Sequence, residues 1–171
     1  MRKFSWLSPR GLPLLASTLG LVFVASGFVG TTAAVAATKD PCKVLTTSEI
    51  SKAFDGATVG KGKAGLKTAA SASCKYAVGA TAGLPAGDLV VHVMFIGGKP
   101  AYDGLKDTPA YVPTTGLSKS IYNERESVVN TLKGSILLGM QGLFTDGTLP
   151  ITYQDVESQL VAASKAGLKR V

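Results

Sequence analysis

Residues 88–96, DLVVHVMFI, form the clearest strand signal in this 171-residue chain. Alternate residues starting at Leu89 would make one face of the strand, and alternate residues starting at Val90 would make the other. Both faces are largely apolar, with His92 the only strongly polar side chain after Asp88. This pattern predicts a central strand in a sheet that is covered on both sides.

Further strands are expected on either side of this stretch. Residues 73–78 form a short strand candidate, which a Gly- and Pro-containing turn at 80–87 connects to the first. Residues 127–132 and 135–140 predict two more strands, joined by a tight hairpin at Lys133-Gly134. The segments 60–72 and 107–118 have no hydrophobic period and are expected to be loops.

Three helices are expected between and around these strands. Residues 45–54 carry a capping box, in which Thr46 and Glu49 exchange hydrogen bonds at the first turn. A short helix is predicted at 100–105, and a long one at 152–169. Strands that pair through short turns, with helices beside them, define an α+β fold with an antiparallel sheet and flanking helices.

The N-terminus has the three parts of a secretory signal peptide. Basic residues precede the apolar run 12–30, and Ala34-Val35-Ala36 supplies the small residues that a signal peptidase requires. We expect cleavage after Ala36 or Ala37, which makes 1–37 the signal peptide and 38–171 a single domain, secreted or associated with the cell wall. The alternative is an uncleaved N-terminal membrane anchor, because the apolar run can just span a bilayer.

Charge and cysteine content narrow the classes of function. The mature chain would keep 15 basic and 11 acidic residues, too small an excess to favour nucleic-acid binding. In an oxidising compartment, Cys42 and Cys74 are expected to form a disulfide, and the alternative is a reactive cysteine. Two cysteines and one histidine give no basis for a metal site, and no cofactor is expected.

The stretch DPCKVLTTSEI at 40–50, followed by CKY at 74–76, resembles a known family. This family comprises small exported actinobacterial proteins, many of them lipoproteins, that share a domain of unknown function and begin with D-P-C-x-L-L-T-x-x-E. The resemblance implies a disulfide between the two cysteines and a PsbP-like α/β/α sandwich. It implies no activity, and this chain lacks the cysteine that would carry a lipid.

Each candidate for catalysis lacks part of its usual pattern. Residues 60–65 match G-x-G-x-x-G, but no strand–helix–strand unit surrounds them. His92 has no nucleophile motif to serve, and Glu124 and Glu126 would share a face only in an extended segment. No catalytic residue is therefore predicted.

Three tyrosines near loops, Tyr102, Tyr111 and Tyr122, are candidate ligand-binding residues. We expect a non-enzymatic, monomeric exported domain that binds a small envelope ligand or an extracellular protein. Two alternatives stay open: a secreted hydrolase that uses His92, and a structural protein held at the wall by its positive charge.

Overall fold

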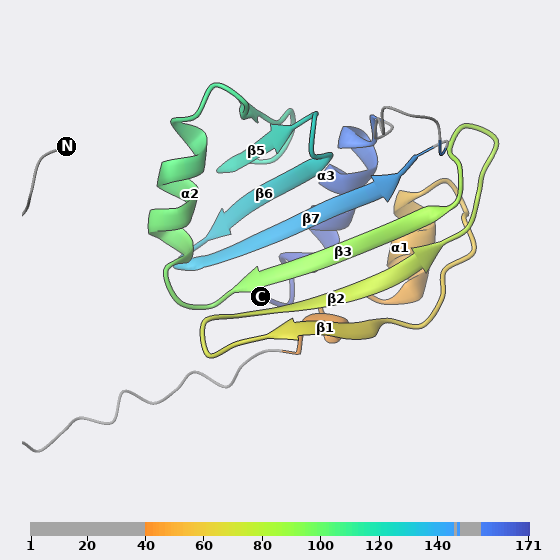
Figure 1. Cartoon of the computed structure of the whole chain (residues 1–171), viewed down its shortest axis with the longest axis horizontal. Coiled ribbons are helices and arrows are strands. Elements are labelled where there is room, and N and C mark those ends of the chain that lie inside the picture. Colours follow the sequence, from red (N-terminus) through yellow and green to blue (C-terminus); the bar gives the residue numbers. More distant parts are fainter. Residues whose placement is uncertain (1–39, 146, 148–154) are drawn as a thin grey trace, which may run out of the picture. The chain divides into compact units, whose positions relative to one another are not determined.

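A computed structural model describes residues 40–145, 147 and 155–171. They form an α+β fold in which a seven-stranded antiparallel sheet has the order β1-β2-β3-β7-β6-β5-β4 (Figure 1). The strands are β1 (Lys63–Lys67), β2 (Ser71–Val78), β3 (Gly87–Met94), β4 (Val112–Pro113), β5 (Ser120–Asn123), β6 (Val128–Lys133) and β7 (Ile136–Phe144). The helices are α1 (Thr47–Ala53), α2 (Gly98–Lys106) and α3 (Glu157–Gly167), with a 3-10 turn at Pro41–Lys43.

One face of the sheet is covered by α1 and α3, which pack against each other (Figure 1). Leu89, Val91 and Val93 of β3 point into this core and are completely buried. Leu160 and Ala163 of α3 belong to the same core, as the predicted apolar stripe of that helix requires. The main hydrophobic core of the described residues lies on this face.

The opposite face carries only α2 among the described helices. This helix packs on β6 and β7 through a small cluster built around Tyr102, Leu132 and Leu137. Val90, His92 and Met94 of β3 also point to this face and stay half-buried. The prediction that β3 is central in the sheet is therefore confirmed, but its second face is only partly covered.

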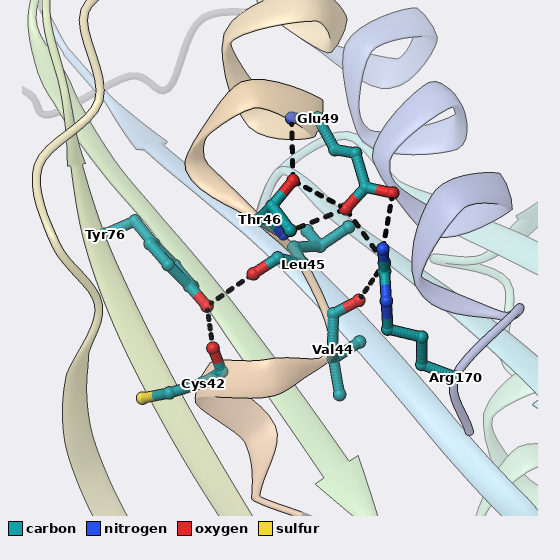
Figure 2. Close-up of polar contacts among 7 residues, drawn as sticks. All are labelled: Cys42, Val44, Leu45, Thr46, Glu49, Tyr76 and Arg170. Carbon is teal, nitrogen blue, oxygen red and sulfur yellow. Dashed lines mark hydrogen bonds and ion pairs between the residues drawn. The ribbon is translucent and has the colours of Figure 1, made fainter.

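The N-terminal motif has a structural role in the fold (Figure 2). The Asp40 carboxylate accepts a hydrogen bond from the Cys42 N–H, which fixes the 3-10 turn. Thr46 and Glu49 form the predicted capping box at the start of α1. The Cys42–Cys74 disulfide is present and joins this turn to β2.

Beside the disulfide, the Tyr76 hydroxyl donates to two carbonyl oxygens, of Cys42 at 2.9 Å and of Leu45 at 3.2 Å (Figure 2). The ring of Tyr76 is buried. These two hydrogen bonds hold the segment that precedes α1 against the sheet.

Two loop predictions need correction. Residues 60–72 are not all loop, because β1 lies within them and pairs with β2. In this pairing Lys63 is opposite Lys75, and Ala64 is opposite Cys74. Every residue of β1 is exposed, so no apolar alternation marks it in the sequence. Residues 107–118 are mostly loop, but Val112–Pro113 form the short edge strand β4.

The hairpin between β6 and β7 forms as predicted, with Gly134 at φ +60° in its turn. The last helix begins at Glu157 and ends at Gly167. The earlier residues 152–154 predicted for it lie outside the described residues, as does the predicted signal peptide, 1–37. Among the described helices, none is both long and apolar enough to span a membrane.

Candidate functional site

A cavity of about 560 Å³ lies on the partly covered face of the sheet, between α2 and the central strands. Its floor comes from β3, β7 and β6, and one wall comes from Ala101, Gly104 and Leu105 of α2. The residues that line it are mostly apolar. A hollow of this size and character is typical of a small-molecule site.

The register of three strands builds the floor. His92 lies opposite Gly139, and Gly139 lies opposite Asn130, so these three residues form one row across β3, β7 and β6. Opposed residues in antiparallel strands point to the same face of a sheet. The imidazole and the amide thus flank a position that has no side chain.

Gly139 leaves this middle position without a side chain, and its two neighbours lie close to where one would be. A Cβ atom there would lie 3.1 Å from the Asn130 Oδ1 atom and 3.4 Å from the His92 Cβ atom. Glycine weakens a strand interior and often marks a place where a ligand or another chain comes close. In the sequence, Gly139 interrupts the apolar run of the strand predicted at 135–140. This interruption is the one sequence signal that could have indicated the site.

The polar end of the cavity is held by the turn between β5 and β6. The Asn123 side-chain oxygen accepts hydrogen bonds from the Arg125 and Glu126 N–H groups, and Gln141 Nε2 donates to the Glu126 carbonyl oxygen. The Glu126 carboxylate accepts a hydrogen bond of 3.4 Å from the Tyr111 hydroxyl. Burial and the Glu126 charge both raise the pKa of Tyr111, so it is a neutral donor at this rim.

The electrostatic state of His92 follows from its surroundings. Its ring makes no hydrogen bond within the described part of the chain, and burial lowers its pKa from the ordinary 6.5. At pH 7 the ring is therefore neutral and offers one N–H donor and one nitrogen acceptor to the cavity.

The structure brings together two of the three predicted tyrosines. Tyr102 and Tyr111 line a second hollow between α2 and the loop that follows it, and Tyr111 also lines the main cavity. Tyr122 points to the other face, where it is buried in the main core and donates to Asp155 at 3.1 Å. Its burial raises its pKa to about 12. A ligand-binding role for these tyrosines stays a prediction.

The geometry around His92 offers little for nucleophilic catalysis. His92 does face a cavity, but no serine, threonine or cysteine lines it. Ser73 is opposite His92 on β2, yet its hydroxyl donates to the Leu66 carbonyl oxygen at 3.5 Å. A base needs a nucleophile within hydrogen-bond reach, and the described residues show none for His92.

The other sequence candidates lie elsewhere. The glycines at 60–65 lead into β1 at the edge of an antiparallel sheet, which is not the setting of a dinucleotide site. Glu124 is exposed, and it is not among the residues that line the main cavity. Within the described ranges, no three His, Cys, Asp or Glu side chains are grouped to hold a metal ion.

Comparison of the chain with protein-family models, curated proteins and solved structures gives no match.

Proposed function

We propose that this protein is an exported, non-enzymatic domain that binds a small, largely apolar molecule in the cavity between α2 and the sheet. The composition of the cavity supports this function. Apolar side chains make most of its lining, and a few polar groups converge at one end: His92, Asn130, Tyr111 and Glu126. Ligand sites combine an apolar wall with a small number of orienting polar groups in this way.

The observation that carries the proposal is the glycine in the floor of the cavity, Gly139. A central strand of a sheet normally gains stability from a β-branched or large side chain. Here β7, which lies between β3 and β6, has a buried glycine in the floor of the cavity. This glycine costs strand stability, and a binding site in which a ligand comes close to the strand would explain the cost.

The signal-peptide pattern and the Cys42–Cys74 disulfide support an exported protein. We also propose membership of the actinobacterial family named above and of the PsbP-like sandwiches. The structural roles of Asp40, Cys42 and Glu49 support this assignment, because they account for three residues of the shared motif.

The test uses N-phenyl-1-naphthylamine, a neutral dye whose fluorescence rises in apolar surroundings. The protein, expressed from the full chain, should bind the dye saturably. Gly104→Leu should weaken binding at least tenfold, because a side chain at this position extends from the wall of α2 and meets no neighbour within 4 Å. Gly139→Val should also weaken dye binding at least tenfold, because its side chain would enter the cavity from the floor.

Gly83→Leu is the matched control. Gly83 also has open space around its Cβ position, but it lies in the turn between β2 and β3 and does not line the cavity. Dye affinity should be unchanged in this variant. No saturable binding to the native protein, or equal loss in the Gly83 and Gly104 variants, would overturn the proposal.

A further inference from the structure

We infer the chemical class of the ligand: an uncharged molecule with an apolar body and one hydrogen-bonding group, a hydroxyl or an amide, that sits over Gly139 between His92 and Asn130. This inference rests on the proposed function and goes further, because it states which molecules the cavity selects.

The spacing of the row sets the size of the polar group. Adjacent strands lie about 4.8 Å apart, so the His92 and Asn130 backbones are roughly 10 Å apart across Gly139. The Asn130 Oδ1 atom leans toward the gap, 3.1 Å from where a glycine Cβ would be. A single small polar group fills such a gap and reaches both side chains.

The chemistry of the two flanking residues sets what that group can be. A neutral imidazole and a primary amide each offer a donor and an acceptor. A hydroxyl or an amide of the ligand can therefore donate to one and accept from the other. Without a ligand hydrogen bond, the His92 ring has no partner among the described residues.

The charges around the cavity disfavour anions. Among the described residues, no lysine or arginine lines it, and Glu126 is the one charged residue that does. Lys75 lies opposite Val90, on β2, but it is paired with Asp88 at 3.1 Å and is not part of the lining. A carboxylate or phosphate would lose its water, would find neutral donors but no positive charge in the lining, and would meet the like charge of Glu126.

The apolar body has a defined place. Met94 and Leu137 form the next row of the floor, opposite each other in β3 and β7. Ala101 and Leu105 of α2 stand over the same end of the cavity. These four side chains offer a continuous apolar surface beside the polar row.

Three compounds with one ring system test the inference at pH 7: naphthalene, 2-naphthol and 2-naphthoate. Each is titrated against protein expressed from the full chain, by displacement of N-phenyl-1-naphthylamine. 2-Naphthol should bind at least tenfold more tightly than naphthalene and at least tenfold more tightly than 2-naphthoate.

The variants His92→Leu and Asn130→Leu should reduce this advantage of 2-naphthol over naphthalene to less than threefold. Ser73→Ala is the matched control, because Ser73 lies beside His92 on the same face but outside the cavity. It should leave all three affinities unchanged. Thermal unfolding of each variant checks that the fold is kept.

The outcomes separate the two proposals. If neither the dye nor naphthalene binds, the proposed function fails. If naphthalene binds but 2-naphthol has no advantage, or 2-naphthoate binds equally well, the ligand class is wrong and the binding function stands. Dye affinity that falls as protein concentration rises would show that a second copy of the chain covers this face, and it would overturn the inference.

Discussion

Arg170 and Glu49 join the residues that follow α3 to helix α1 through a two-pronged ion pair. Arg170 Nη1 lies 2.8 Å from Glu49 Oε2, and Nη2 lies 2.9 Å from Oε1 (Figure 2). Arg170 Nη1 also donates to the Val44 carbonyl oxygen at 3.1 Å. The same Glu49 carboxylate completes the capping box with Thr46, so one side chain serves both the start of α1 and its contact with the C-terminus.

The hydrogen bond from Arg170 is the main reason that the pKa of Glu49 falls from 4.5 to about 2. A carboxyl group with a lowered pKa in the folded state stabilises the fold above its unfolded-state pKa, and this contribution is lost as the pH falls toward 2. We expect Glu49→Gln to lower the free energy of unfolding by about 1 kcal/mol at pH 7, since the pair is partly exposed to solvent.

Urea unfolding at pH 7 and near pH 2 measures the free energy of unfolding of the native protein and of Glu49→Gln. The difference in free energy between the two proteins should be much smaller at the lower pH. Asp103→Asn is the control, because Asp103 forms exposed ion pairs within α2 only and should show no measurable effect. A Glu49→Gln effect that is equal at both pH values would show that the ion pair does not stabilise the fold.

Removal of the Tyr76 hydroxyl should destabilise the protein. Tyr76→Phe leaves two carbonyl oxygens, those of Cys42 and Leu45, without this donor. We expect a loss of about 1–3 kcal/mol in the free energy of unfolding, measured by urea denaturation. Tyr102→Phe is the control, since its hydroxyl makes no hydrogen bond within the described residues, and it should change stability by less than about 0.5 kcal/mol. Equal effects in both variants would contradict the role of Tyr76.

The disulfide should contribute more than either polar contact. Cys42 and Cys74 are 32 residues apart, and closing a loop of that length stabilises a fold by roughly 3–4 kcal/mol in the chain-entropy model. The double variant Cys42→Ala/Cys74→Ala should unfold at a correspondingly lower urea concentration. A reducing agent should shift the midpoint of the native protein in the same direction and leave the double variant unaffected. An unshifted midpoint in the double variant would be evidence against this contribution.

His92 should titrate below its ordinary pKa of 6.5, because burial disfavours the charged ring. As it is the only histidine, its ring protons can be followed directly by NMR. Below pH 6.5 the unfolded chain takes up the proton more readily than the folded one. The free energy of unfolding therefore decreases as the pH is lowered from 6.5 to the pKa of His92 in the folded protein. An NMR midpoint at or above 6.5 would contradict the half-buried position of the ring.

The sequence predicts those parts of the fold that local chemistry decides. The capping box at Thr46 and Glu49, the central strand and the turn at Gly134 all depend on residues close together in the chain, and each is confirmed, although the strand predicted at 88–96 ends at Met94. The α+β class with an antiparallel sheet follows from the same signals. The predicted PsbP-like detail stays a prediction.

Elements that depend on distant partners were missed. β1 contains no β-branched residue and is entirely exposed, so only its pairing with β2 defines it. β5 has four residues, all buried, and it is too short to show a period. The cavity is the clearest case, because it depends on a register that aligns His92, Gly139 and Asn130 from three strands.

The place of β7 in the sheet bears on when the chain can fold. Of the described strands, β7 is the last along the chain, yet it lies between β3 and β6 and is the one that joins β1–β3 to β4–β6. Until residue 144 is available, the two halves share no ladder, and α3 and Arg170 must still follow to close the core over α1. Pairing along β7 is therefore the step that joins the two halves of the described sheet, and it requires every residue from β1 to β7 to be available.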